Sequence, residues 1–280
     1  MRRKKRKGWR MPIETKKTGT KEWAPHSMNI FTGCSHNCRY CYARHDALRY
    51  KRIADPEKWT TMEPNHKAYL KKAKKIDGRI MFPTTHDLLP EHKWYIRDYL
   101  EPWLEEGNDF LLVTKPHLEV VKFLCEEFVA YRKQITWRFT IGSMDDEILR
   151  FWEPGAPSFI YRLSALQTAY SRGYSTSVSC EPFLDRKVKE LFLTLRSAIT
   201  DTFWVGKMNR ISTRVDVSKI ENKDFFRYVE PLINPIKEGI YSDHFIKNEL
   251  YGDLAFRYDE KVRWKDSIKK VLGLPEEDIG

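Results

Sequence analysis

Three cysteines that fall within eight residues constrain this chain more than any other feature. They are Cys34, Cys38 and Cys41, in the sequence GCSHNCRYCYAR, so their spacing is C-x3-C-x2-C. Thiolate is a soft ligand that suits iron–sulfur clusters and zinc. A short loop lets three sulfurs converge on one centre, and Gly33 permits the tight turn that such a loop needs. The motif therefore predicts a metal centre, and we expect a [4Fe-4S] cluster.

Zinc is the main alternative for this motif. A structural zinc site takes four ligands, commonly as pairs of cysteine or histidine. His36 or His45 could supply a fourth ligand, but no second Cys or His pair stands elsewhere at zinc spacing. Three thiolates leave one coordination position open, and a catalytic metal binds substrate or cofactor at such a position. Three buried, reduced cysteines without any metal are the remaining alternative.

Short apolar runs alternate with longer amphipathic segments from Met28 onward, which indicates an α/β fold. Alternating strands and helices imply parallel strands joined by right-handed crossovers. We expect a partial (β/α)6 TIM-type barrel, although periodicity alone allows an open doubly wound sheet. The predicted strands are 28–33, 79–85, 109–116, 135–143, 174–182 and 201–209. The predicted helices are 91–107, 117–133, 156–173 and 185–199, with one more from Asp259 to Val271.

Polar and thiol side chains gather at the ends of these predicted strands. Ligands in parallel βα folds bind at the carboxyl ends of the strands, so we expect a site there. The residues at these ends are Cys34, the run Thr84-Thr85-His86-Asp87, Thr114-Lys115, Ser143, Cys180-Glu181, Lys207 and Asn209.

The positive charge of the chain is concentrated at its beginning. The net charge is +11, and residues 1–21 hold ten Lys or Arg and one Glu, a local balance of +9. We expect a basic, flexible tail at 1–24, the barrel at 25–245 and a helical extension at 246–280. A basic tail attracts polyanions such as DNA or RNA, although a solvated arm without a partner has the same composition.

Composition also predicts where the protein resides. No stretch approaches the roughly 20 apolar residues of a membrane span, and no apolar run follows the basic N-terminus as in a secretory signal. The five cysteines are an odd number, and three are clustered, unlike a disulfide framework. We therefore expect a soluble, cytoplasmic protein in a reducing environment, with no membrane partner.

The segment 33–44, which carries the three cysteines and is called the cluster loop below, resembles that of the radical S-adenosylmethionine (radical SAM) superfamily. The likeness includes Tyr40, an aromatic residue directly before the last cysteine. Within the superfamily, the loop is most similar to that of spore photoproduct lyase-like proteins, and residues 153–173 resemble their fourth βα unit. The resemblance covers about residues 28–210. It implies a [4Fe-4S] cluster on the three cysteines, S-adenosylmethionine on the fourth iron, and a 5′-deoxyadenosyl radical that removes hydrogen from substrate. It also implies a reducing partner such as flavodoxin or ferredoxin.

The resemblance suggests which side chains hold the cofactor. Many members carry Gly-Gly-Glu after the second strand, whereas this chain has Pro83-Thr84-Thr85, whose hydroxyls we expect to bind the amino group. The other expected cofactor ligands are Tyr40 for adenine, Ser143 for ribose or carboxylate, Arg162 for the carboxylate, and Lys207 and Asn209 for adenine or substrate. The alternatives are that Tyr40 is an aromatic residue of the core, that Ser143 caps a helix, and that Arg162 is an ordinary surface arginine.

Cys180 ends the fifth predicted strand, and a thiol there could return a hydrogen atom to a substrate radical. A small buried thiol is the alternative, and Cys125 is expected in the core. His86 and Asp87 could act as acid–base groups, or Asp87 could cap the next helix.

These features together predict a radical SAM enzyme that acts on a nucleic acid. A radical SAM enzyme acting on a peptide or small metabolite is the second hypothesis. A non-enzymatic zinc or iron–sulfur module that binds nucleic acid is the third.

Overall fold

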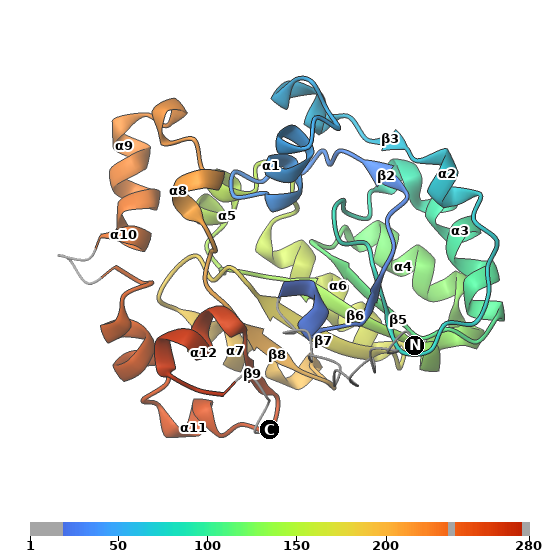
Figure 1. Ribbon diagram of the computed structural model, residues 1–280. Coiled ribbons are helices and arrows are strands. Elements are labelled where there is room, and N and C mark those ends of the chain that lie inside the picture. The colour runs from blue at the N-terminus through green and yellow to red at the C-terminus, as the bar shows by residue number, and fades with distance from the viewer. Residues whose placement is uncertain (1–18, 235–238, 276–280) are drawn as a thin grey trace, which may run out of the picture.

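A seven-stranded, entirely parallel sheet forms the centre of the molecule in the computed structural model, which describes residues 19–234 and 239–275 (Figure 1). The strands run in the spatial order β1-β4-β5-β6-β7-β8-β9. Their bounds are β1 His26–Ser27, β4 Ile80–Phe82, β5 Phe110–Thr114, β6 Ile135–Thr140, β7 Ser175–Cys180, β8 Phe203–Val205 and β9 Val262–Trp264. The sheet curls into a half-barrel, which confirms the predicted partial-barrel fold.

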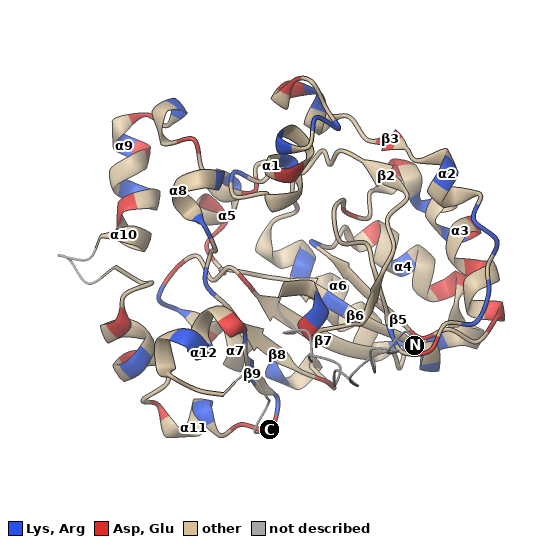
Figure 2. Cartoon of the chain, viewed as in Figure 1, with Lys and Arg blue, Asp and Glu red and all other residues tan. Residues whose placement is uncertain are grey.

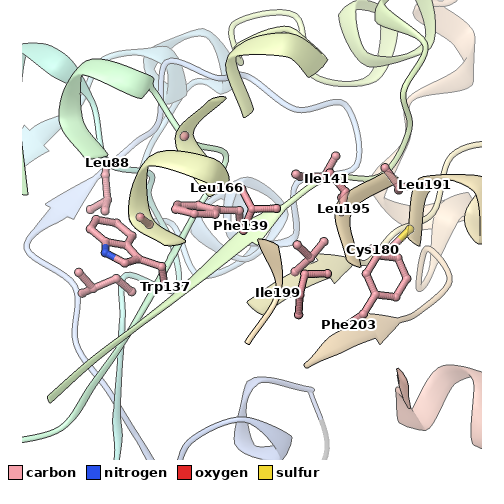
Figure 3. Packing of buried hydrophobic residues seen from close by; sticks show 14 of the residues in the cluster. Leu88, Trp137, Phe139, Ile141, Leu166, Cys180, Leu191, Leu195, Ile199 and Phe203 are labelled. Atoms are coloured by element: carbon pink, nitrogen blue, oxygen red, sulfur yellow. The ribbon is translucent and has the colours of Figure 1, made fainter. Parts of the chain in front are cut away.

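Helices cover the convex face of the sheet, and this face holds the hydrophobic core (Figures 1 and 3). Strand residues that face the helices are large and apolar, as with Trp137 and Phe139 on β6, whose rings stack at 5.5 Å. Each such fully buried side chain stabilises the fold by roughly 2 kcal/mol. The covering helices are α3 Lys93–Glu105, α4 Leu118–Glu127, α6 Phe159–Ser171 and α7 Val188–Leu195.

The concave face carries the alternate residues of the same strands. Because successive side chains of a strand point to opposite faces, the register of the sheet forms rows across this concave surface. One row pairs Thr140 of β6 with Ser179 of β7, and Ser179 with Trp204 of β8. These residues are more polar than those of the convex face, so the interior of the half-barrel is suited to a ligand rather than to a core.

The predicted first strand is partly wrong. Only His26–Ser27 joins the main sheet, whereas Phe31–Thr32 (β2) pairs antiparallel with Glu63–Pro64 (β3). Asn29 is the reason, because its side-chain oxygen accepts hydrogen bonds from the backbone N–H groups of Thr84 (2.7 Å) and Thr85 (2.8 Å). The chain therefore leaves the edge of β4 at this residue and passes over the end of the strand.

The predicted helix at 259–271 is also partly wrong. Residues Val262–Trp264 form strand β9, parallel to β8, and helix α12 begins at Asp266 and ends at Leu272. Val262 and Trp264 are buried while Arg263 between them is less so, which is the alternation of a strand. The five other predicted strands are confirmed, each within its predicted range.

The remaining helices lie around the carboxyl ends of the strands and along the C-terminal part of the chain. They are α1 Tyr42–Arg49, α2 His66–Tyr69, α5 Asp146–Trp152, α8 Ile211–Arg214, α9 Asn222–Asp224, α10 Glu230–Ile233 and α11 Leu254–Arg257. None of the helices in the described ranges is long and apolar enough to cross a membrane. Residues 1–18 of the predicted basic tail lie outside the described residues.

Candidate functional site

A cavity of about 450 Å³ opens at the carboxyl ends of the strands, on the concave side of the half-barrel. All three motif cysteines line it, together with side chains from every part of the sheet. Those that matter below are Gly19, Trp23, Cys34, Cys38, Tyr40, Cys41, Tyr42, Thr84, Thr85, His86, Asp87, Lys115, Ser179, Glu181, Lys207, Asn209, Arg214 and Lys265. The position matches the rule that parallel βα folds bind ligands at this edge.

The cluster loop is held from both of its ends. The backbone N–H of Cys34 donates to the carbonyl of Trp59 at 2.7 Å. Gly33 has φ +99°, and a Cβ there would lie 2.1 Å from the Thr61 carbonyl oxygen, so only glycine fits. Cys41 is the N-cap of α1, and its sulfur accepts a hydrogen bond from the N–H of Arg44 at 3.4 Å. The loop is thus fixed in the cavity wall by backbone contacts rather than by flexible side chains.

The sulfurs of the motif are not gathered closely enough for a single ion. Within the described ranges, the only group of three or more Cys, His, Asp or Glu ligand atoms within 4.8 Å of one another is Cys34, His36 and Asp87. Three thiolates on one tetrahedral zinc would lie roughly 4 Å apart, given zinc–sulfur bonds of about 2.3 Å. The three cysteines therefore present wider spacing than a mononuclear site requires.

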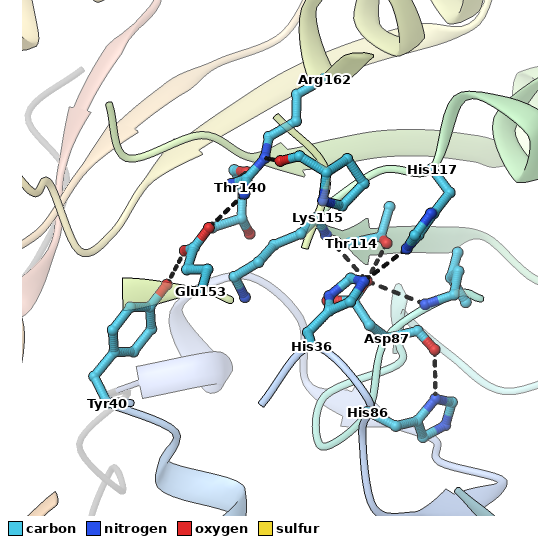
Figure 4. A network of polar contacts seen from close by, with 12 residues as sticks. His36, Tyr40, His86, Asp87, Thr114, Lys115, His117, Thr140, Glu153 and Arg162 are labelled. Atoms are coloured by element: carbon cyan, nitrogen blue, oxygen red, sulfur yellow. Dashed lines mark hydrogen bonds and ion pairs between the residues drawn. The ribbon is translucent and has the colours of Figure 1, made fainter. Parts of the chain in front are cut away.

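His36 is already engaged through both ring nitrogens (Figure 4). Its Nδ1 lies 3.0 Å from Asp87 Oδ2, and its Nε2 lies 2.8 Å from His117 Nε2. Burial, followed by the neighbouring His36, lowers the pKa of His117 to about 4. The group of Cys34, His36 and Asp87 is therefore satisfied by its own hydrogen bonds.

Asp87 joins the cluster loop to the ends of two strands. Its carboxylate accepts hydrogen bonds from the Thr114 hydroxyl, from the backbone N–H of Lys115 at 3.0 Å and from that of Leu88 at 3.1 Å. Burial would raise the pKa of Asp87, but His36 lowers it to below its ordinary value. Asp87 therefore remains ionised, and the prediction that it caps the next helix is wrong.

Lys115 places a half-buried positive charge beside the cysteines. Burial alone would lower the pKa of its ammonium, but Cys38, followed by Glu153, Asp87 and Cys34, raises it above its ordinary value. No carboxylate oxygen of the described residues lies within 4.0 Å of its Nζ, so the charge has no direct ion pair. The side chain lies 5.8 Å from the centre of the Tyr40 ring.

Tyr40 is fixed by a buried ion pair behind it (Figure 4). Its hydroxyl donates to Glu153 Oε1, and Glu153 Oε2 lies 2.6 Å from Arg162 Nη2. Arg162 in turn donates to the carbonyls of Pro157 (2.7 Å) and Thr140 (3.2 Å). Burial would raise the pKa of Glu153, but Arg162 and Lys115 lower it, so the carboxylate is charged.

The structure brings most of the predicted site residues together. The three cysteines, Tyr40, Thr84, Thr85, Lys207 and Asn209 all line the cavity. Ser143, Arg162 and Cys180 do not line it. Ser143 donates to Asp185 and accepts from the N–H of Asp145 at 2.9 Å, and Arg162 is the fully buried partner of Glu153 rather than a surface residue.

Cys180 is fully buried among the core residues of the convex face, close to Phe203 in Figure 3. Burial raises the pKa of its thiol well above the ordinary value. Its neighbours Ser179 and Glu181 line the cavity instead. The Ser179 hydroxyl is buried and has no hydrogen-bond partner among the described residues. The period of two along a strand could have identified Ser179 and Glu181 from the sequence.

The far wall of the cavity comes from the first described segment, residues 19–24. Lys265 lies 2.9 Å from Glu22 Oε1 and 3.7 Å from Glu181 Oε2, and it donates to the Gly19 carbonyl at 2.8 Å. Its ammonium also lies 4.2 Å from the centre of the Trp23 ring. No sequence pattern predicts this contact, because residues 22 and 265 are distant along the chain.

Comparisons with known proteins extend this description. No protein-family model matches the chain. The chain is 31% identical over 180 residues to the uncharacterized protein ORF301 of Acidianus two-tailed virus, and the match covers 60% of this chain and 58% of that protein. The chain therefore spans less than two thirds of the length of this relative.

Two solved structures share the fold. One is a double mutant of spore photoproduct lyase with bound AdoMet and dinucleoside spore photoproduct, with a TM-score of 0.51, 20% identity, and coverage of 74% of this chain and 64% of that one. The other is Streptococcus suis SuiB bound to precursor peptide SuiA, with a TM-score of 0.51, 11% identity, and coverage of 88% and 50%. Both are radical SAM enzymes. The chain has the partial-barrel fold of the radical SAM enzymes, as its cysteine motif predicted.

Proposed function

We propose that this chain is a radical SAM enzyme that holds a [4Fe-4S] cluster on Cys34, Cys38 and Cys41. The observation that carries the proposal is the presence of all three thiols in one cavity beside Lys115, a half-buried cation with no carboxylate ion pair among the described residues. When bound, the cluster would supply the electron that cleaves S-adenosylmethionine and yields the radical that takes hydrogen from substrate. An external donor such as flavodoxin or ferredoxin would deliver that electron in the cytoplasm.

The thiols fit a cluster better than they fit zinc. Their spacing exceeds that of a mononuclear site, and the nearest histidine, His36, has no free ring nitrogen to complete one. Burial raises the pKa of the Cys38 thiol to about 12, so this thiol keeps its proton until a metal centre displaces it. Lys115 would partly offset the negative charge of an iron–sulfur cluster.

The residues around the cysteines can bind the rest of the cofactor. Lys115 is suited to the carboxylate of S-adenosylmethionine, because it is a half-buried cation that forms no carboxylate ion pair among the described residues. Thr84 and Thr85, ordered by Asn29, are suited to the amino group, since Asn29 Nδ2 already donates to Thr84 Oγ1 at 2.7 Å. Tyr40 forms the adjoining wall and is held rigid by Glu153. The unpartnered Ser179 hydroxyl is a further polar group for ribose.

We propose that the substrate is a nucleic acid, whose base or sugar loses the hydrogen atom. The excess positive charge of the chain supports this, because polyanions release counterions when they bind such a surface. The likeness to the fold of spore photoproduct lyase, a protein solved with a dinucleoside, supports the same class.

Replacing Cys38 by Ala tests the proposal. The anaerobically reconstituted full chain should be brown and hold about four irons, and it should convert S-adenosylmethionine to 5′-deoxyadenosine with dithionite. The Cys38→Ala variant should lose this cleavage by at least two orders of magnitude. Cys125→Ala, in the core of α4, is the matched control and should retain both iron and cleavage. Undiminished cleavage by Cys38→Ala would exclude the proposal.

A further inference from the structure

Two basic segments, at α1 and at α8, lie near each other in Figure 2, and both contribute residues to the cavity lining. The first, residues 207–214 with the sequence KMNRISTR, leads into α8 and holds three basic residues and no acidic one. The second, residues 42–52 with the sequence YARHDALRYKR, is α1 and the turn after it, and it holds four basic residues and one acidic one. Each segment therefore carries a local charge of +3, in a body that is otherwise close to neutral.

Arg214 connects the two segments. Its guanidinium lies 5.7 Å from the centre of the Tyr42 ring, the first residue of α1, and it lines the cavity. No carboxylate of the described residues forms an ion pair with it. A half-buried arginine without a carboxylate partner keeps its planar donor groups available for an anion.

Arg210 adds a second charge next to Arg214. The backbone N–H of Arg214 donates to the carbonyl of Arg210 at 3.1 Å, so the two residues lie one helical turn apart. Arg210 also has φ +54° and ψ 45°, a left-handed conformation that is uncommon for a residue with a side chain. Strained backbone of this kind concentrates at functional sites. The fold thus maintains two like charges at the opening.

The turn after α1 offers an aromatic ring as well as charge. Tyr50 is 63% exposed, and the guanidinium groups of Arg49 and Arg52 lie 5.5 Å and 5.9 Å from the centre of its ring. Exposed aromatic rings beside arginines bind single-stranded nucleic acids, because bases stack on the ring while the arginines contact phosphates. A peptide of ordinary composition has no matching demand for this many cations.

We propose that this α1–α8 rim, made of Arg49, Tyr50, Arg52, Arg210 and Arg214, binds the phosphate backbone and one base of a nucleic-acid strand while the target nucleotide enters the cavity. This inference rests on the proposed function and assigns its substrate a docking surface. Arg210 and Arg214 each take one of the phosphates next to the target nucleotide, and Tyr50 stacks on a neighbouring base.

The test is fluorescence anisotropy of a labelled 12-nucleotide single strand, as DNA and as RNA, with the reconstituted full chain and S-adenosylmethionine at 50 to 300 mM salt. The double variant Arg210→Gln/Arg214→Gln should weaken binding at least tenfold. It should also reduce the slope of log affinity against log salt by about 1.4, since each lost phosphate contact to a single strand contributes about 0.7. Tyr50→Ala should weaken binding about tenfold with little change in slope.

The matched control is Arg132→Gln/Lys133→Gln. It removes the same charge just before β6, at the amino ends of the strands, whereas the cavity lies at their carboxyl ends. An equal loss in control and rim variants would overturn the proposal, because general charge would then explain the binding. Unchanged binding in both the control variant and the rim variants would also overturn the proposal. Binding of an acidic peptide, but not of the oligonucleotide, with the same dependence on Arg210 and Arg214 would assign the rim to a peptide and also overturn it.

The proposed function and this inference fail separately. Cleavage of S-adenosylmethionine without substrate reports the first, and anisotropy reports the second. If the double variant does not fold, the single variant Arg210→Gln, whose side chain is exposed, should still reduce the salt slope by about 0.7.

Discussion

His86 illustrates how a single buried residue sets a pH dependence. Its Nε2 accepts a hydrogen bond from the backbone N–H of Ile30 at 3.1 Å, and its Nδ1 lies 3.1 Å from the Asp87 carbonyl oxygen. The imidazole therefore has to be neutral, with the proton on Nδ1. Burial accordingly lowers the pKa of His86 to about 4 from 6.5. A second proton would break the contact that ties the chain before β2 to the cavity wall.

The expected result is a loss of stability in acid that depends on His86. Its pKa is lower in the folded chain, so the unfolded chain binds more protons between pH 6.5 and 4. The stabilising contribution is complete above pH 6.5 and falls by about 3 kcal/mol as the pH approaches 4. Urea unfolding at pH 7 and pH 4.5 measures this difference. His86→Gln should show a smaller fall than the wild type, and equal falls would contradict the assignment.

For single residues, the alternation of side chains along a strand explains which site residues could be predicted from the sequence and which could not. The cysteines, Tyr40 and the threonines were predictable because a short motif and strand ends fix them. Cys180 was placed on the cavity rim, but a side chain one residue along a strand points to the other face. Ser179, one residue before Cys180, is the one whose side chain lines the cavity. Buried partners such as Arg162 were not predictable, because the sequence does not state what packs behind Tyr40.

Among the elements, the cluster loop depends on two glycines that allow close backbone contact. A Cβ at Gly33 would meet the Thr61 carbonyl oxygen at 2.1 Å, and one at Gly155 would meet the Ser35 carbonyl oxygen at 2.2 Å. The N–H of Gly155 also donates to the His36 carbonyl at 3.0 Å. The loop is therefore clamped between the segment around residue 60 and the turn after α5.

Gly33→Ala should abolish iron uptake and lower stability by several kcal/mol, because both the positive φ and the backbone clash oppose a side chain. Gly173→Ala is the matched control. Gly173 also has positive φ, +76°, but nothing lies within 4 Å of an added Cβ. It should lose only about 1–2 kcal/mol and keep its iron. Iron content and thermal unfolding measure both effects, and normal iron in Gly33→Ala would show that the clamp is dispensable.

The elements themselves were predictable where a long pattern specified them. The strands at the centre of the sheet are rich in β-branched and aromatic residues, and the helices between them have clear apolar faces. Strand β9 was not predictable, since a three-residue strand inside a charged segment has no periodicity that separates it from a helix. Strand β2 depended on the side chain of Asn29, which acts only after β4 has formed.

For the whole molecule, the main feature is the junction between the segments 19–24 and 262–266. Lys265 is only 2% exposed, and it is the cation between Glu22 and Glu181. Burial raises the pKa of Glu181, but Lys265 opposes this effect. Trp23 adds an edge-on contact to Trp204, with ring centres 6.1 Å apart. The junction supplies the wall that a complete barrel would have built from further strands.

Lys265→Met should lower the free energy of unfolding by about 3 kcal/mol, because it leaves two buried carboxyl groups without their cation. It should also expose the Lys21–Glu22 bond to trypsin, which mass spectrometry would detect. Lys270→Met, which removes a surface ion pair to Asp266 at 61% exposure of the lysine, should change stability by less than about 1 kcal/mol and leave cleavage unaltered. Similar behaviour of both variants would mean that the junction is not a structural tie.

This junction also sets an order of events during synthesis. The cysteine loop leaves the ribosome well before Lys265, on which its opposite wall depends. A nascent chain would therefore display its thiols without an enclosed chamber around them. Cofactor loading is then expected to follow synthesis of the segment 262–266 rather than to begin when the cysteines emerge.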